Sequence, residues 1–343
     1  MEKIIINTVS QSSEIFVGEK WTNVIHYLPG KDVVIVTDEN VYQIFKEDFP
    51  DFPVLSIVPG EVSKRLEVIE YLAQRLLDLG IDRSGFVLAI GGGVVCDVAG
   101  FLASIYMRGV RFGFVSSTLL SQVDASVGGK NAVNLGSVKN TLGNFRQPQF
   151  VICDPAMLKT LPEEEYLSGL AELIKNGIIM DETLVKEIER NSISILNLNS
   201  DILTSLISRS VELKASVVRR DEKESDKRMI LNFGHTFGHV IETQANQKHG
   251  FAVASGIIIA ADISVKEGLL SGDERARIFN LLNRYNLIRK YKISSDQFEK
   301  LIVQDKKKRG DIISFVLLQS IGRAIVRKYT VKQLIKLYKS INY

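Results

Sequence analysis

The first half of the chain alternates short β-rich runs with segments of helical periodicity. Compact apolar runs at 32–37 (DVVIVT), 54–58 (VLSIV), 86–90 (FVLAI) and 111–116 predict buried strands, and helical spacing at 63–79 and 94–106 separates them. Strands that alternate with helices are typical of a parallel α/β sheet. This pattern excludes an all-helical or all-β first half.

The second half changes character near residue 162. From there the periodicity is helical, at about 181–196, 200–220, 228–243, 251–268 and 273–285, and no strong strand run appears before 311–318. We therefore predict an α/β protein with two domains. An α/β domain spans residues 1–162, and a mainly α-helical domain spans residues 163–343.

Charge and hydropathy argue against a nucleic-acid-binding, membrane or secreted protein. The net charge is only +3, so we expect no nucleic-acid and no membrane-surface partner. The most apolar stretch, 251–265, contains Ser255 and Asp262 and is too short for a transmembrane helix. No signal peptide is apparent in MEKIIINTVS. With Cys96 and Cys153 interpreted as reduced core thiols, we expect a soluble, cytoplasmic protein.

Gly91-Gly92-Gly93 follows a predicted strand and opens a predicted helix. Such a turn lets backbone N–H groups approach a pyrophosphate at the positive end of the helix. The dinucleotide pattern is incomplete, because Cys96 occupies the place of its last glycine. Asp38 and Asn40 end an earlier strand and could hold a ribose. A tight turn without ligand remains equally compatible with these residues.

The stretch 122–145 is rich in glycine, asparagine and lysine, but it is not a Walker A loop. Lys130, Lys139 and Asn140 lie on glycine-punctuated backbone and suit a phosphate held by charge and donors together. A solvated loop is the structural alternative.

Three of the four histidines, His235, His239 and His249, fall within fifteen residues. Arg228, Asn232, His235 and His239 are spaced by 4, 3 and 4, so on a helix over 228–243 they would share one face. Burying that polar stripe without partners costs about 1–3 kcal/mol per group, so we expect it to face a ligand or a cavity.

His249 lies fourteen residues beyond His235. On one helix that separation is about 21 Å, too far for a shared metal. The segment 244–250 (QANQKHG) has the composition of a helix break, and a helical hairpin would return His249 to His235. Glu172, with Lys175 one turn further on, is the best third ligand for a catalytic divalent-metal site. A satisfied core or surface histidine is the alternative for each imidazole taken alone.

Long motifs complete the sequence evidence. GGGVVCDVAGFLASIYMRG, LLSQVDASVGGKNAVN, LKTLPEEEYLSGLAELIKNGI, LNFGHTFGHVIE and KHGFAVASGI occur in this order between about residues 30 and 325. In these motifs the chain closely resembles the 3-dehydroquinate synthases of the sugar-phosphate cyclase superfamily. The resemblance implies an N-terminal Rossmann-like parallel-sheet domain, a helical C-terminal domain, a cytoplasmic homodimer and a role in aromatic amino acid biosynthesis.

The resemblance also implies roles for residues at the matching positions. It implies a zinc or cobalt ion held by Glu172, His235 and His249. It implies NAD held by Asp38, Asn40, Glu61, Lys64, Gly92, Gly93, Val94, Asp97, Ser117, Thr118, Lys130, Lys139, Leu158 and Thr160. Substrate or catalytic contacts would come from Asp124, Lys130, Asn140, Lys175, Lys214, Arg228, Asn232, His239 and Lys306, with Arg108 supplied across the dimer interface.

Three positions depart from the usual family pattern. Ser117 stands where threonine is frequent, Cys96 where glycine is common and Asn176 where tyrosine is frequent. Ser117 keeps a hydroxyl, and Cys96 slightly crowds the glycine turn. None of the three removes a group that the implied chemistry needs.

The implied reaction is the second step of the shikimate pathway, in which a lyase converts the sugar phosphate 3-deoxy-D-arabino-heptulosonate 7-phosphate to 3-dehydroquinate and phosphate. It proceeds by transient NAD oxidation at C5, phosphate elimination, re-reduction, ring opening and aldol cyclisation. Lys130, Asn140, His239 and the Lys306 region would grip the phosphate, and Lys214 and Arg228 suit the C1 carboxylate.

Three alternatives are weighed against this interpretation. A related cyclase whose substrate lacks a carboxylate would leave Lys214, Arg228 and Asn232 unpaired. A metal- and NAD-dependent polyol or glycerol dehydrogenase would not need the phosphate-binding Lys130, Lys139 and Asn140. A non-catalytic binding protein would not need the Glu172, His235 and His249 set.

Overall fold

The computed structural model describes residues 1–9, 11–136, 138–245, 247–289 and 311–341. The chain forms two compact units. The N-terminal unit comprises Met1–Pro162 and Ser194–Lys223, and the C-terminal unit comprises Glu163–Ile193 and Glu224–Tyr343. The chain first passes from one unit to the other between Pro162 and Glu163. The predicted division differs in one segment, because Ser194–Lys223 packs with the N-terminal unit.

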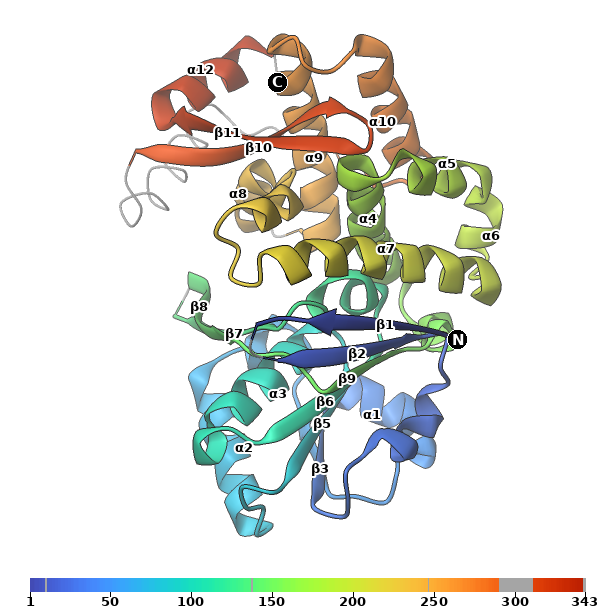
Figure 1. Ribbon diagram of the computed structural model, residues 1–343, viewed down its shortest axis with the longest axis vertical. Coiled ribbons are helices and arrows are strands. Elements are labelled where there is room, and N and C mark those ends of the chain that lie inside the picture. The colour runs from blue at the N-terminus through green and yellow to red at the C-terminus, as the bar shows by residue number, and fades with distance from the viewer. Residues whose placement is uncertain (10, 137, 246, 290–310, 342–343) are drawn as a thin grey trace. The chain divides into compact units, whose positions relative to one another are not determined.

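A seven-stranded sheet forms the centre of the N-terminal unit (Figure 1). Its strand order is β1(Glu2–Asn7), β2(Ser12–Val17), β9(Phe150–Cys153), β6(Arg111–Ser116), β5(Phe86–Gly91), β3(Val33–Asp38) and β4(Val54–Ile57). Only β1 runs antiparallel to its neighbour, and the other pairs are parallel. The predicted α/β class with a parallel sheet is therefore confirmed.

The central strands are apolar on both faces, as in sheets covered by helices on each side. Every residue of β5 is buried. Ile35 and Leu88 join Trp21 and Phe150 in one hydrophobic cluster. The alternate residues point to the opposite face, where α3 packs on β5 and β6. Cys96 and Cys153 are buried free thiols, as expected.

The remaining elements of the N-terminal unit connect or cover the strands. They are η1(Trp21–Tyr27), α1(Glu39–Phe45), η2(Lys46–Asp48), η3(Glu61–Ser63), α2(Leu66–Asp78), α3(Gly93–Ile105), η4(Tyr106–Arg108), the π-helix η5(Ser121–Ala125), the hairpin β7(Lys130–Leu135)–β8(Val138–Phe145), η6(Pro155–Thr160) and α7(Ser200–Arg220). The short helix α6(Ser192–Leu196) lies where the chain re-enters this unit.

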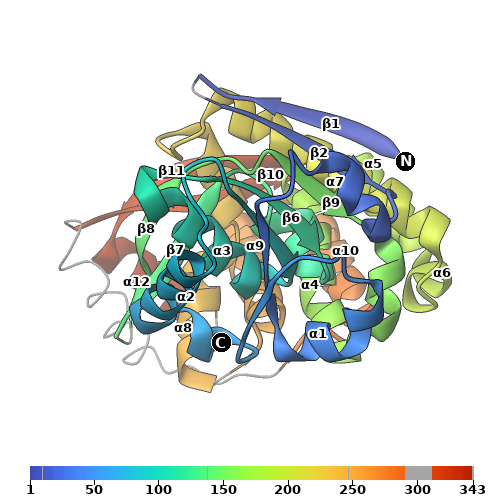
Figure 2. The same ribbon diagram turned by 90° about the horizontal axis from the view of Figure 1, so that it is seen from below.

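Helix α7 explains why Ser194–Lys223 belongs to the N-terminal unit. It runs beside β1 and β2 and also contacts η5 and η6 (Figure 2). Its buried side chains include Leu203, Ile207 and Val211. Helical periodicity predicts this helix but not which hydrophobic core it covers. The prediction therefore places α7 in the C-terminal domain, whereas it packs in the N-terminal unit.

The C-terminal unit is mainly helical. It contains α4(Glu163–Met180), α5(Glu182–Arg190), η7(Lys227–Asn232), α8(His235–Ala245), α9(His249–Lys266), α10(Gly272–Arg284), the antiparallel pair β10(Ile312–Ser320)–β11(Arg323–Thr330) and α12(Val331–Ser340). Helix α9 packs against α4, α8, α10 and β10.

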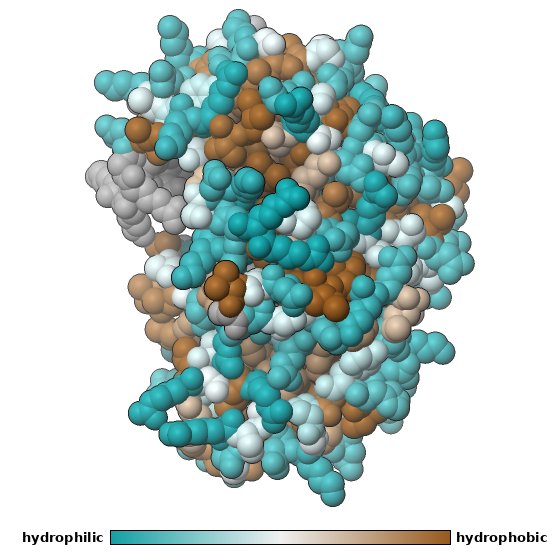
Figure 3. All heavy atoms as spheres, in the orientation of Figure 1, coloured by the Kyte–Doolittle hydropathy of each residue, from teal (hydrophilic) through white to brown (hydrophobic). Residues whose placement is uncertain are grey.

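Helix α9 is the one helix within the described ranges that is long and apolar enough to cross a membrane. However, 72% of the tested window is buried inside the protein, as in the core helix of a globular unit. On the face of the molecule in Figure 3, hydrophilic side chains are interspersed with smaller hydrophobic areas.

Candidate active site

Glu172 is a fully buried carboxylate in the C-terminal unit. It lies in the middle of α4, an eighteen-residue helix, and its exposed fraction is 0%. Burying an isolated carboxylate is prohibitively unfavourable, so it must be paired. Lys175, one turn later and also buried, forms an ion pair with Oε2 of Glu172. The other oxygen, Oε1, faces two imidazoles.

His249 reaches Glu172 because α9 begins very close to α4. A Cβ at Gly250 would overlap the carbonyl oxygen of Ser168 on α4, so only glycine fits there. The Gly250 N–H donates to Oγ of Ser168 over 2.9 Å. The predicted helix break before His249 is confirmed, because α8 ends at Ala245 and α9 starts at His249.

His235 opens α8, and here one sequence expectation is wrong. The predicted continuous helix over 228–243 is interrupted at Gly234, whose φ of +79° ends the 3-10 helix η7. A Cβ at Gly234 would stand 2.9 Å from the backbone nitrogen of Ile257 on α9. Arg228 and Asn232 therefore lie on η7, and only His235 and His239 share a helix.

The three predicted ligands come together. One ligand atom from each of Glu172, His235 and His249 lies within 4.8 Å of the others. Oε1 of Glu172 is 3.6 Å from Nε2 of His235 and 3.5 Å from Nε2 of His249. Ligands about 2.1 Å from a tetrahedral ion are separated by about 3.4 Å, so these spacings suit a zinc-like cation better than direct hydrogen bonds.

The electrostatics of the triad favour ligand-competent forms at two positions. Burial raises the pKa of Glu172, but Lys175 and the two imidazoles outweigh it and hold that pKa well below its usual range. Burial, reinforced by Lys175, lowers the pKa of His235 to about 3. Burial also lowers the pKa of His249, but Glu172 and Glu242 outweigh it and raise that pKa to about 9. A cation must therefore displace a proton from His249.

His239 stands at the exposed side of the triad. Its ring centroid is 5.4 Å from that of His235 and 6.3 Å from that of His249. Its side chain is exposed, unlike those of the other two. This geometry leaves His239 able to reach a molecule that approaches the triad.

Of the other predicted substrate contacts in the C-terminal unit, Arg228 is buried in η7. Asn232 donates from Nδ2 to Glu224 over 2.6 Å. Lys306 lies outside the described residues.

In the N-terminal unit, Nζ of Lys214 donates to Oδ1 and to the backbone carbonyl of Asp124, both over 2.5 Å. Lys130 and Asn140 are exposed on the β7–β8 hairpin, and Asn140 has a φ of +53°. Arg108 is exposed and also has a positive φ, +65°. The structure describes the two units separately, so the predicted combination of Lys214 with Arg228 stays a prediction.

The glycine turn has the shape of a nucleotide cradle. Strand β5 ends at Gly91 and α3 begins at Gly93, so the first-turn N–H groups of a thirteen-residue helix are directed at this point. A Cβ at Gly92 would approach the side-chain atom Cγ2 of Thr118 to 2.9 Å. Oγ of Ser117 is buried and accepts or donates no hydrogen bond among the residues described. These features fit a ligand that brings a polar partner to Ser117.

The other predicted nucleotide residues already have local partners. Asp38 accepts from the Val41 N–H over 3.0 Å and caps α1, and burial raises its pKa. Lys64 pairs with Asp97 over 2.5 Å, and Glu61 accepts from Asn134 over 2.7 Å. Three further side chains are exposed, those of Asn40, Lys139 and Thr160, whereas Leu158 is buried.

Comparisons with known proteins decide the family. Residues 54–168 match the family described as 3-dehydroquinate synthase N-terminal, and residues 169–308 match the family described as 3-dehydroquinate synthase C-terminal. The 3-dehydroquinate synthase of Thermoanaerobacter pseudethanolicus is 43% identical over 317 residues, which cover 89% of each chain. The chain belongs to the 3-dehydroquinate synthase family.

Solved structures place the family in a wider fold. A 2-deoxy-scyllo-inosose synthase complexed with carbaglucose-6-phosphate, NAD+ and Co2+ is 26% identical with a TM-score of 0.87, over 99% of both chains. A probable glycerol dehydrogenase from Sinorhizobium meliloti is 12% identical with a TM-score of 0.66, over 96% of this chain and 95% of that one. This probable glycerol dehydrogenase therefore shares the fold, whereas the sequence relationship is to 3-dehydroquinate synthases.

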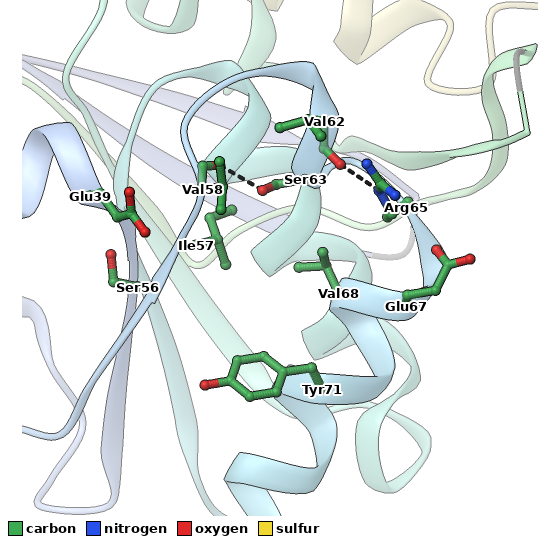
Figure 4. A pocket seen from close by; sticks show the side chains of 10 residues that line it. All are labelled: Glu39, Ser56, Ile57, Val58, Val62, Ser63, Arg65, Glu67, Val68 and Tyr71. Carbon is green, nitrogen blue, oxygen red and sulfur yellow. Dashed lines mark hydrogen bonds between the residues drawn. The ribbon is translucent and has the colours of Figure 1, made fainter.

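A pocket of about 470 Å³ lies beside the predicted nucleotide residues of this family member (Figure 4). It is lined from α1, β4, η3 and α2 by Glu39, Ser56, Ile57, Val58, Val62, Ser63, Arg65, Glu67, Val68 and Tyr71. Glu39 stands between Asp38 and Asn40 in sequence, and Ser63 precedes Lys64. Its lining combines apolar side chains, such as Ile57 and Val68, with the charged Arg65 and Glu67.

Sequence reasoning missed Glu242. Its Oε2 lies 3.1 Å from Nδ1 of His249, and its side chain is only 15% exposed. The signal was available, because Glu242 follows His239 by three residues and His235 by seven, on the same helical face.

Proposed function

We propose that this protein is a 3-dehydroquinate synthase, a cytoplasmic carbon–oxygen lyase that converts 3-deoxy-D-arabino-heptulosonate 7-phosphate to 3-dehydroquinate and phosphate. The observation that carries the proposal is the buried Glu172–His235–His249 triad in a chain whose two halves match the two 3-dehydroquinate synthase families. Three protein ligands leave one position of a tetrahedral ion open, which is typical of catalytic rather than structural sites.

Two bound groups are part of the proposal. When bound, a divalent metal, zinc or cobalt, supplies Lewis-acid stabilisation of an alkoxide, and NAD supplies a hydride acceptor and donor. Glu172, His235 and His249 would hold the metal. The glycine turn at Gly92 and Gly93 would hold NAD. The ligand spacings of 3.5 and 3.6 Å and the unsatisfied Ser117 hydroxyl support this assignment.

The residues around the triad have separable roles. Lys175 contacts Oε2 of Glu172, which keeps that carboxylate ionised and turns Oε1 toward the imidazoles. His239, exposed beside both imidazoles, would donate a hydrogen bond to a substrate oxygen. Arg228 would pair with the C1 carboxylate, and Asn232 would hydrogen-bond a substrate hydroxyl.

The N-terminal unit would supply the remaining contacts. Asp124 holds Nζ of Lys214 over 2.5 Å and thereby orients its ammonium for an anionic group such as the C1 carboxylate. The exposed Lys130 and Asn140 would bind the phosphate, together with Lys306. A cation and an amide suit a phosphate that must be held until the C–O bond breaks.

The test is phosphate release from 3-deoxy-D-arabino-heptulosonate 7-phosphate by purified, metal-loaded protein, with and without NAD. We expect stoichiometric phosphate and 3-dehydroquinate, dependence on NAD, and no net NADH. The Glu172→Gln variant is the matched inactive control. Absence of phosphate release, together with steady NADH production from a polyol, would instead identify a dehydrogenase.

Arg108 is proposed to act across a homodimer interface. It is exposed, and it and Met107 both have positive φ, a conformation that needs support in non-glycine residues. Arg108→Ala and His235→Ala are each expected to be inactive. Refolding them together should restore up to about a quarter of the activity, because one mixed site then has both intact groups. If the mixture stays inactive while forming mixed dimers, Arg108 does not act in the partner's site.

A further inference from the structure

The two imidazoles of the triad are anchored differently at their second nitrogen. Both direct Nε2 at Oε1 of Glu172. Nδ1 of His235 lies 3.2 Å from the backbone carbonyl oxygen of Phe233, a neutral acceptor fixed by the chain. Nδ1 of His249 lies 3.1 Å from the carboxylate oxygen Oε2 of Glu242. The triad therefore has one neutral anchor and one charged anchor.

The helical hairpin explains how Glu242 reaches His249. Glu242 lies in the last turn of α8, on the face that also carries His235 and His239. Helix α9 packs against α8 from its first turn, and His249 is its first residue. The side chains of Glu242 and His249 are 15% and 27% exposed, so water screens their contact only in part.

A carboxylate at this position has a specific chemical consequence. An imidazole that donates from Nδ1 has its lone pair on Nε2, the nitrogen that faces Glu172. Partners of this kind fix the ring orientation and raise the basicity of a ligating imidazole. The Phe233 carbonyl fixes the ring of His235 in the same way, but as a neutral acceptor it raises the basicity of Nε2 less than a carboxylate does.

We propose that Glu242 is a positioning residue of the metal centre, accepting the Nδ1–H of His249 so that Nε2 is held as a ligand. The inference rests on the metal site proposed above. A purely structural contact between α8 and α9 would need only a hydrogen bond, whereas this role also needs the carboxylate's charge. Glu242→Gln separates the two, because it keeps the size and an acceptor oxygen but removes the charge.

The experiment is a Co2+ titration of the metal-free full-length protein, followed by visible absorption and by competition with a chelator. We expect Glu242→Ala to weaken Co2+ binding by about 10- to 100-fold and to alter the absorption of the bound ion. Glu242→Gln should fall between this variant and the parent, and Glu242→Asp should recover part of the loss. Gln244→Ala, an exposed position on the same helix, is the control and should match the parent.

Thermal melting of the metal-free proteins accompanies each titration. If Glu242→Ala folds poorly, the comparison of Glu242→Gln with the parent decides the question alone. Parental Co2+ affinity and absorption in Glu242→Gln would overturn the proposal, as would a parent that binds no Co2+. If the parent binds Co2+ but releases no phosphate from the heptulosonate phosphate, the proposed function is wrong. The comparison of Co2+ affinities among the variants still tests the role of Glu242 in that case.

Discussion

The Glu172–His235–His249 triad and the predicted nucleotide-binding residues differ in burial and in where they lie in the fold. Glu172 is fully buried, and its partners are side chains of three helices of one unit. The predicted nucleotide residues are spread over strand ends, helix α3, the β7–β8 hairpin and short connections of the other unit, and several are exposed. The triad is assembled by core packing, whereas the proposed nucleotide site combines the N–H groups of the glycine turn with dispersed side chains.

This difference predicts different sensitivities. The ligands of the triad have no substitutes, so the loss of one changes the chemistry. Nucleotide contacts are distributed over many groups, and backbone N–H groups survive any side-chain substitution. Substitution of a triad residue should therefore abolish activity, whereas substitution of a predicted nucleotide residue should lower NAD affinity only in part.

The largest effect is expected for Glu172→Gln. A neutral amide is a poor ligand for a hard cation and cannot balance Lys175, so kcat/KM for phosphate release should fall by at least about 10³-fold, or about 4 kcal/mol. Bound metal after dialysis should fall in parallel. Full metal occupancy with parental kcat/KM would contradict the assignment of Glu172.

The next largest is expected for Gly250→Ala, which tests the packing that assembles the triad. The new methyl group overlaps the Ser168 carbonyl, so α9 must move away from α4 and the free energy of unfolding should fall by about 3 kcal/mol. Urea unfolding followed by circular dichroism measures it. Gly272→Ala is the control, because a Cβ there has no neighbour within 4 Å. If the two variants unfold with equal free energies, α9 and α4 can accommodate a methyl group at Gly250 and the close packing is not required.

A graded effect is expected for Ser117→Ala in the N-terminal unit. The hydroxyl is buried without a partner among the described residues, so its removal should not lower the melting temperature of the NAD-free protein. NAD affinity should fall by about 5- to 10-fold, the worth of one hydrogen bond. Ser126→Ala is the opposite control, since that buried hydroxyl donates to the Ser121 carbonyl over 2.7 Å. It should lower stability and leave NAD binding unchanged.

The smallest effect is expected for Asp38→Asn, which keeps the N-cap of α1. Burial raises the pKa of Asp38, so the folded protein binds its proton more readily than the unfolded chain does. This contribution to stability is present at low pH and is lost as the pH rises through the folded pKa. The variant should therefore match the parent in acid and melt slightly higher at neutral pH, with a few-fold weaker NAD binding. Scans at several pH values test the trend, and a variant less stable at neutral pH would reverse it.

The sequence predicts the central strands well because β3, β5 and β6 are continuous apolar runs. It does not reveal β1, β2 or β9. In β1 the apolar run is only Ile4, Ile5 and Ile6, and Ile5 is exposed, so this edge strand lacks the longer runs that mark the central strands. The helix expected over 228–243 fails at Gly234, where tertiary packing against α9 selects a left-handed conformation that periodicity cannot register.

The candidate site shows the same limits. The imidazoles can be found from sequence because the chain has only four histidines, whereas Glu172 is one of many carboxylates and is distinguished by its apolar helical surroundings. The backbone N–H groups proposed to bind NAD cannot be identified from residue type, because every residue except proline has one. Asp124 and Lys214 illustrate a further limit. Their 2.5 Å contact joins residues ninety positions apart, and no local pattern reports it.

The return of α7 to the N-terminal unit has a consequence for synthesis on the ribosome. Strand β1 emerges long before the helix that packs along it, because that helix ends only at Arg220. At about 5–20 residues per second, β1 waits about 10–40 s for that cover. The N-terminal unit therefore cannot mature as an isolated leading segment, and nascent chains shorter than this length would expose an apolar strand face to chaperones.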